Sequence, residues 1–312
     1  MCGIVGLYLK NRELEPQLGR LFEPMLCAMC DRGSDSAGFA IYGDEVPAGQ
    51  VKFTLQQGDT DYDWETFFEE LKRDLTSGGS AGRHVEWFRN ASAAVLKTDL
   101  GEEKVREWVL AHHPEVYIMS VGRSIEILKG VGSPQEIAAR FDLAGMQGTH
   151  IIGHTRMATE SAVNLEGSHP FSTGMDLCLV HNGSLSNHNR LRQKLWRHGI
   201  RFETENDTEV AAGYLTWKLR EGFTLTQALE AALKDLDGFY TFTVGTRDGF
   251  AVVRDPIACK PAVMAETEDY VAMASEYRAL ATLPGADQAQ VWEPRPGRVY
   301  VWEREKEERL SA

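Results

Sequence analysis

A cysteine at the second position is the first residue whose chemistry stands out. Cys2 follows the initiator Met1, and removal of Met1 would leave a thiol and a free α-amine on one residue. The amine has a reference pKa of about 7.7–8.0 and the thiol one of about 8.5. The amine could therefore take the proton of the thiol, so that one residue supplies both nucleophile and base. A lone cysteine is more often a small buried hydrophobic residue, so this interpretation depends on its surroundings.

Two polar clusters could line a site around such a nucleophile. His181-Asn182-Gly183 follows a stretch that predicts a strand over Asp176–Val180. Asn-Gly in that place is typical of a hairpin turn, but the Asn182 amide and the Gly183 N–H could also form an oxyanion hole. The second cluster, Asp31–Gly38, predicts a tight turn, to which Arg32 adds a positive charge.

Two charged residues could hold the ends of an amino acid. Arg156 follows the predicted strand Thr149–Ile152, and a buried charge in that place needs an anionic partner. A ligand carboxylate bound bidentately would serve, and so would an internal Asp or Glu. Asp207 begins a predicted helix over Asp207–Arg220, as its N-cap or as a partner for an ammonium group. A thiol with its base, a donor pair, a cation and an anion together suit an α-amino acid amide, and glutamine fits.

The same motifs resemble those of the class II glutamine amidotransferases. Six occur in order: Cys-Gly-Ile-Val-Gly at 2–6, Arg-Gly-x-Asp-Ser-x-Gly at 32–38, Gly-His-Thr-Arg-x-Ala-Thr at 153–159, His-Pro-Phe at 169–171, His-Asn-Gly at 181–183 and Asp-Thr-Glu at 207–209. Later pieces extend the match to Pro261, so the resemblance covers nearly the whole chain. It implies an α+β fold of the αββα type, in which two stacked antiparallel sheets lie between layers of helices.

The resemblance also implies roles for individual residues. Cys2 would be the nucleophile and its α-amine the base, with Asn182 and Gly183 as the oxyanion hole. Substrate-binding roles would fall to Arg156 for the glutamine carboxylate and Asp207 for its amino group, with supporting residues Arg32, Thr159 and His181. The γ-amide would give a glutamyl thioester and ammonia, and water would then release glutamate.

Two departures from the common motifs of the class II amidotransferases point to a subgroup within that family. Met157 stands where many members have an aromatic residue, and about 115 positions separate Gly38 from Gly153. These features look most like stand-alone amidotransferase subunits of the glutamate-synthase type, including that of N-methylglutamate synthase. Because no phosphosugar, nucleotide or flavin module is expected after the glutaminase part, a partner synthase subunit would receive the ammonia. No cofactor or metal is expected in this chain, whereas the partner could carry FMN and an iron–sulfur cluster.

The organisation expected from the sequence is one domain over residues 1–312 with an elaboration at about 61–145. A strand is predicted to begin at Cys2 and a helix to cover Arg20–Cys30. Within the elaboration we expect helices at 63–75, 102–112 and 135–144. A strand pair at 116–121 and 124–128 is expected between the second and third of these helices.

Composition excludes several classes of protein. The net charge of −13 argues against a nucleic-acid partner, and no apolar run reaches the roughly 20 residues that a membrane span needs. The odd count of five cysteines and the lack of a signal-peptide pattern favour a reducing, cytoplasmic location. Cys27 and Cys30 form a Cys-x-x-Cys pair without further ligands, so core packing is favoured over metal.

Two other functions remain open from the sequence. One is a different N-terminal-cysteine amidase or acylase, which would have no need for both Arg156 and Asp207. The other is a non-catalytic, glutamine-binding subunit, in which a retained Met1 would block the α-amine.

Overall fold

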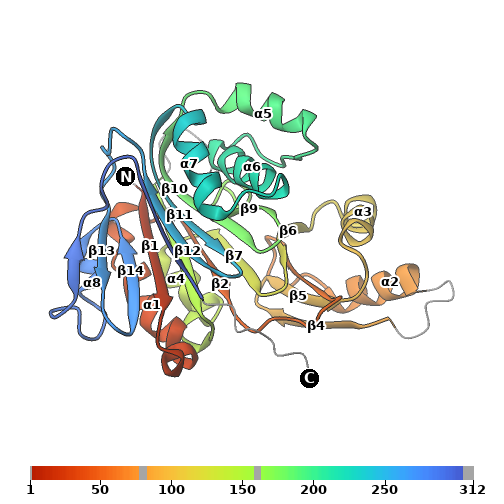
Figure 1. The fold of residues 1–312 in the computed structure, drawn as a ribbon. Coiled ribbons are helices and arrows are strands. Elements are labelled where there is room, and N and C mark those ends of the chain that lie inside the picture. Colours follow the sequence, from red (N-terminus) through yellow and green to blue (C-terminus); the bar gives the residue numbers. More distant parts are fainter. Residues whose placement is uncertain (1, 77–82, 158–162, 305–312) are drawn as a thin grey trace, which may run out of the picture.

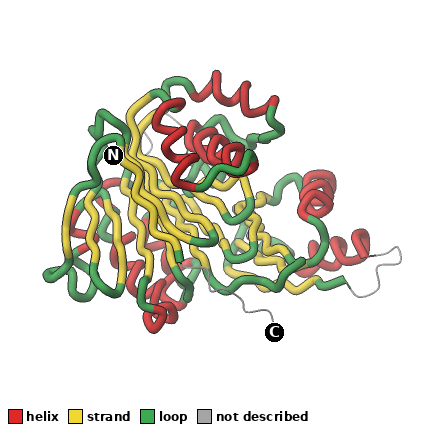
Figure 2. Tube along the Cα trace, viewed as in Figure 1, coloured by secondary structure: helices red, strands yellow, loops and turns green. Residues whose placement is uncertain are grey.

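The chain folds into two stacked antiparallel sheets with helices on both outer faces (Figure 1). The structure is a computed structural model and describes residues 2–76, 83–157 and 163–304. Strands, helices and loops of the whole described chain are distinguished in Figure 2. The layers are those of the predicted αββα sandwich.

The first sheet has seven strands in the order β15-β13-β14-β1-β8-β2-β7. Its strands are β1 (Gly3–Leu9), β2 (Ser36–Tyr42), β7 (Ile125–Val131), β8 (His150–Arg156), β13 (Val263–Glu266), β14 (Tyr270–Ala274) and β15 (Gln290–Trp292). Both faces of the central strand β1 are buried: Ile4 and Tyr8 face the second sheet, while Val5, Leu7 and Leu9 belong to the core under the helices. The apolar run at the start of the sequence is thus explained by burial on two sides.

The second sheet has five strands in the order β16-β12-β11-β10-β9. They are β9 (Phe171–Gly174), β10 (Leu177–Leu185), β11 (Gly238–Thr246), β12 (Gly249–Arg254) and β16 (Arg298–Glu303). Val180, Phe250 and Val252 from this sheet pack against Ile4 and Met273 from the first. This contact forms the middle layer of the core.

Two groups of helices cover the outer faces. The seven-stranded sheet carries α1 (Leu18–Cys27), α4 (Pro134–Arg140) and α8 (Tyr277–Leu280), with short 3₁₀ turns at Arg12–Gln17, Cys30–Arg32 and Leu143–Gly145. The five-stranded sheet carries α5 (His188–Arg197), α6 (Asp207–Arg220) and α7 (Leu225–Asp235). The predicted helix Arg20–Cys30 thus ends earlier, at Cys27, and the chain tightens into the turn that holds Arg32.

A smaller sheet projects to one side of the sandwich (Figure 1). It has the order β4-β5-β3-β6, from β3 (Val51–Gln56), β4 (Val85–Asn90), β5 (Ala93–Thr98) and β6 (Tyr117–Gly122). Helices α2 (Trp64–Thr76) and α3 (Glu102–His112) pack on it through a core of their own that includes Phe53, Phe67 and Trp108.

The elaboration expected at about 61–145 differs from this unit at both ends. The third sheet starts with β3, before residue 61, whereas β7 and α4 belong to the main sandwich. Both strands predicted at 116–121 and 124–128 are present, as β6 and β7, but they lie in different sheets, so the predicted pairing is wrong. That the whole chain forms one domain stays a prediction. No helix in the described part of the chain is long and apolar enough to cross a bilayer.

Candidate active site

The start of β1 brings Cys2 to one end of the sandwich. Strand β1 lies between β14 and β8, and Gly3 pairs with Thr155 of β8. Cys2 and Arg156 are the next residues along these antiparallel strands, so their backbones lie at the same edge of the sheet. The sequence predicted a strand ending at Ile152, but β8 continues through Arg156.

The backbone carbonyl of Cys2 receives two side-chain hydrogen bonds. Arg32 Nε donates to it over 2.9 Å and Asn182 Nδ2 over 3.2 Å. Arg32 is 7% exposed and Asn182 4% exposed, whereas Cys2 is half-buried. A side-chain amide has two N–H groups, so Asn182 can hold Cys2 with one and offer the other to a ligand. The structure therefore brings together Cys2, Asn182 and Arg32.

The Asn-Gly sequence is not a hairpin turn, because β10 runs on to Leu185. Gly183 pairs with Tyr240 of β11. On the far side of β11, the Tyr240 N–H donates to Oδ2 of Asp255 over 2.9 Å and the Tyr240 C=O accepts from the Asp255 N–H over 3.0 Å. Gly183 and Tyr240 therefore form a non-hydrogen-bonded pair. The Gly183 N–H consequently points away from β11, in the same direction as the N–H of Leu185 two residues on. It is a donor that the β11 ladder does not use.

Glycine is required at position 183 for steric reasons. Its φ is 148°, and an added Cβ would lie 2.0 Å from the carbonyl oxygen of Phe239. The same Cβ would lie 2.9 Å from Nε2 of His181. His181 Nε2 is buried and has no hydrogen-bond partner among the described residues. The backbone at Gly183 thus lies next to Nε2 of His181, a nitrogen that can still form a hydrogen bond.

Asp207 faces the same stretch of β10. Its Oδ2 accepts a 2.9 Å hydrogen bond from Leu185 N, and its Oδ1 lies 3.6 Å from His181 Nδ1. Burial favours the neutral acid, but the contact with His181 and the Leu185 N–H together outweigh it and hold the pKa of Asp207 at about 2. Asn206, not Asp207, caps the helix, through a bond from Thr208 N. The Asp207 carboxylate is therefore charged at neutral pH and is not needed as a cap.

Arg156 is the last residue of β8, and it lies beside the segment Asp31–Gly38 that was predicted as a tight turn. A Cβ at Gly33 would lie 2.4 Å from the carbonyl carbon of Arg156, so only glycine lets the turn approach so closely. Asp35 N donates to Arg156 O over 3.1 Å. Arg156 is 8% exposed, and its Nη1 lies near Gly167, where an added Cβ would be 3.4 Å away.

Three buried histidines, His154, His169 and His181, lie behind the site. His154 Nε2 bonds to the carbonyl of His181 over 3.1 Å, and the rings of His154 and His169 stack with centroids 4.0 Å apart. His181 Nδ1 meets Thr208 Oγ1 at 3.0 Å. Burial lowers the pKa of His154 to about 3, so it is neutral at pH 7. The His-Pro-Phe motif was the available signal for His169.

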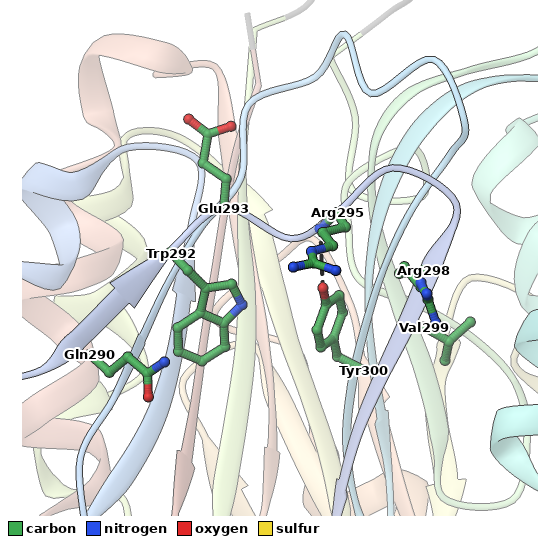
Figure 3. Close-up of a pocket in the computed structure, with 7 residues that line it drawn as sticks. All are labelled: Gln290, Trp292, Glu293, Arg295, Arg298, Val299 and Tyr300. Carbon is green, nitrogen blue, oxygen red and sulfur yellow. Dashed lines mark hydrogen bonds between the residues drawn. The ribbon is translucent and has the colours of Figure 1, made fainter.

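Thr159 and the Cys-x-x-Cys pair are the remaining residues singled out in the sequence. Thr159 lies outside the described residues. Cys27 and Cys30 are free and half-buried, and burial raises the pKa of the Cys27 thiol to about 11. A pocket of about 540 Å³ lies between the edge strands β15 and β16 (Figure 3), lined by Gln290, Trp292, Glu293, Arg295, Arg298, Val299 and Tyr300. None of the predicted site residues lines it.

The chain is similar to known glutamine amidotransferases. Residues 154–282 match a family described as the glutamine amidotransferase domain. The glutamine amidotransferase-like protein GlxB of Rhizobium meliloti is 56% identical over 306 residues, covering 98% of this chain and 99% of that protein. A Methanothermobacter thermautotrophicus protein, provisionally named as a glutamine amidotransferase, is 36% identical over 97% of this chain and 100% of its own.

A solved structure supports the fold. Glutamine phosphoribosylpyrophosphate amidotransferase from B. subtilis superposes with a TM-score of 0.59 at 21% identity, over 97% of this chain and 47% of that one. The match to its fold and the similarity to full-length relatives lead to one conclusion: the chain belongs to the class II glutamine amidotransferases.

Proposed function

We propose that Cys2, made N-terminal by removal of Met1, is the nucleophile that hydrolyses the γ-amide of glutamine. The observation that carries this proposal is the pair of donors at the start of β1. Asn182 already bonds to the Cys2 carbonyl, and the neighbouring Gly183 N–H points away from the β11 ladder. The side chain of Asn182 is thus within hydrogen-bond distance of the residue that would attack, and Gly183 is the next residue along β10.

The chemistry follows from these groups. The α-amine of Cys2 takes the thiol proton, and the thiolate sulfur attacks the γ-amide carbon. The second N–H of Asn182 and the Gly183 N–H bind the oxygen that becomes negative. The amine then gives the proton to the departing nitrogen, so ammonia leaves and a glutamyl thioester remains. Water, deprotonated by the same amine, attacks the thioester, and the products are glutamate and the free thiol.

The charged groups would orient the substrate. Arg156 would bind the α-carboxylate of glutamine and Asp207 its ammonium group, with Arg32, Thr159 and His181 as supporting residues. An ion pair with a partly buried carboxylate is a charge-assisted hydrogen bond and stronger than a neutral one. The charge on Asp207, secured by its pKa of about 2, supports this assignment.

The test is a glutaminase assay of Cys2→Ala together with the intact mass of the native protein. We expect the mass of the chain without Met1 and loss of glutamate formation in the variant. Cys27→Ala is the matched control, because Cys27 is also free and half-buried, and it should keep its activity. Retention of Met1, or full activity of Cys2→Ala, would contradict the proposal. Hydrolysis of simple acyl amides in preference to glutamine would instead favour an acylase.

The fate of the ammonia is the second part of the proposal. We infer that it passes to a synthase subunit of the glutamate-synthase or N-methylglutamate-synthase type, in which FMN and an iron–sulfur cluster would do the redox chemistry. The described helices and strands are accounted for by the amidotransferase sandwich and the third sheet, which supports placing the acceptor site outside them. The long stretch between Gly38 and Gly153 supports the narrower assignment.

Co-purification with a flavin-containing synthase subunit encoded nearby tests this part. We expect a complex in which glutamine hydrolysis is faster than in the isolated chain. Cys2→Ala should still bind the synthase but should fail to supply it with ammonia from glutamine, while added ammonium salt restores the product. Absence of both association and stimulation would count against the partner.

A further inference from the structure

The segment after β14 holds the first residues of the chain in place. Ser275 N donates to the carbonyl of Ile4 over 2.9 Å, and Ile4 N donates to Ser275 Oγ over 2.9 Å. Ile4 is two residues from Cys2. The next residue along, Glu276, therefore lies beside the start of β1, although it is far from Cys2 in the sequence.

The carboxylate of Glu276 joins two guanidinium groups. Its Oε1 accepts a 2.7 Å bond from Arg32 Nη1, and its Oε2 lies 2.8 Å from Arg278 Nε. Arg278 also bonds to Asp31 over 2.6 Å, on the same turn as Arg32. Both oxygens of Glu276 are thus engaged, and its carboxylate is fixed in one orientation.

Glu276 is an ionic partner of a nearly buried arginine. The Arg32 side chain is 8% exposed, whereas that of Glu276 is 35% exposed. Arg32 Nη2 is buried without a hydrogen-bond partner among the described residues. Removing the carboxylate would leave a buried guanidinium without its counter-charge, which is strongly unfavourable. The Arg32 side chain would then be expected to move toward solvent, where its charge is hydrated.

The orientation of Arg32 matters because its Nε donates to the Cys2 carbonyl over 2.9 Å. A continuous chain of contacts therefore runs from Glu276 through Arg32 to the backbone of Cys2. That bond restrains the Cys2 carbonyl, which is joined to the same Cα as the thiol and the α-amine. Asn182 Nδ2 shares the same carbonyl, so a shift there would also misplace a proposed oxyanion donor.

We infer that Glu276 is a positioning residue of the amidotransferase reaction, acting through Arg32 to orient Cys2. The inference rests on the proposed role of Cys2 as nucleophile. Glu276 itself need not touch glutamine. Its removal should therefore slow the chemical step and leave substrate affinity largely unchanged.

Steady-state kinetics of Glu276→Ala and Glu276→Gln test this role. We expect kcat of Glu276→Ala to fall by about tenfold or more, because small misplacements of reacting groups have effects of that size, with KM within about twofold. Glu276→Gln keeps an acceptor oxygen for Arg32 Nη1 but lacks the counter-charge, so it should recover part of the lost kcat. The rate at which iodoacetamide alkylates Cys2, followed by peptide mass spectrometry, should change in parallel with kcat.

A matched control is Glu15→Ala. Glu15 pairs with Arg304 over 2.7 Å at similar partial burial but has no contact with Arg32 or Cys2, so kcat should stay at the wild-type value. The inference is overturned if Glu276→Ala keeps wild-type kcat, if its loss lies in KM, if Glu276→Gln is as impaired as Glu276→Ala, or if Glu15→Ala loses as much. Activity in Cys2→Ala would instead overturn the proposed nucleophile, so the two failures are distinguishable.

Discussion

At the scale of single residues, the candidate site is built from side chains whose charge states are set by their immediate contacts. Asp207 is an example: burial would raise its pKa, and His181 and the Leu185 N–H reverse that effect. His154, with a pKa lowered to about 3 by burial, stays neutral. The Asp207 anion and the neutral His154 imidazole thus coexist within one small region.

Replacing Asp207 by Asn tests whether that charge binds the substrate. Asn keeps the size and an acceptor for Leu185 N, but it lacks the negative charge. A hydrogen bond to a charged group contributes about 1.5–3 kcal/mol, so we expect KM for glutamine to rise by about tenfold to a hundredfold, with a smaller change in kcat. Steady-state kinetics measure this. Unchanged KM would show that the ammonium group is bound elsewhere.

The individual site residues differ in how far the sequence reveals them. Cys2, Asn182 and Asp207 stand in short motifs whose residue types suggest a reaction. Glu276 gives no such signal, because its partner Arg32 is 244 positions away in the sequence. Such a pair becomes visible only when the sheet brings β14 alongside β1.

At the scale of elements, most strands were predictable, but their ends at the site were not. The predicted strands stop at Ile152 and Val180, whereas β8 and β10 continue through Arg156 and Leu185. Polar residues interrupt the apolar pattern there, and their partners, such as the bond from His154 to the His181 carbonyl, come from the other sheet. The alternation of apolar and polar residues cannot reveal that a strand continues where its polar side chains form hydrogen bonds with distant parts of the chain.

Some elements were not predicted at all. The hairpin of β4 and β5 turns at Ala91, a non-glycine residue with φ of 52°, so the usual glycine signal is absent. Helix α5 buries only Leu191, Arg192 and Leu195, a narrow stripe for a helix of ten residues. Both elements depend on neighbours for their burial, and this information is not local.

At the scale of the whole molecule, buried histidines couple stability to pH. Burial lowers the pKa of both His150 and His154 to about 3, against about 6.5 in an unfolded chain. Between these values the unfolded state binds more protons than the folded state, so stability falls as pH falls below about 6.5. The slope is at most about 1.4 kcal/mol per pH unit for each histidine.

Urea unfolding at pH 7.5, 6 and 5 measures this dependence. We expect the midpoint to drop between pH 6 and pH 5. His150→Asn should make the dependence less steep, because one buried histidine with a lowered pKa is removed while His154 and His169 remain. Equal midpoints at all three pH values would contradict the inferred neutral histidines. Asp207 adds a separate dependence at lower pH. Because its pKa is lower in the folded than in the unfolded chain, its charged carboxylate stabilises the fold above about pH 4, and that contribution is lost toward pH 2.

The central position of β1 also dictates when the enzyme can become active during its synthesis. Both neighbours of β1 come later in the chain: β8 after residue 149, and β14 only at Tyr270–Ala274. β1 therefore pairs on both sides with strands that are far from it in the sequence, and a topology of such high contact order folds slowly. Arg32 cannot reach Glu276, nor Ile4 its partner Ser275, until that late segment has emerged. The contacts that hold Ile4, Arg32 and the Cys2 carbonyl are therefore completed only after Ser275 and Glu276 have been synthesised.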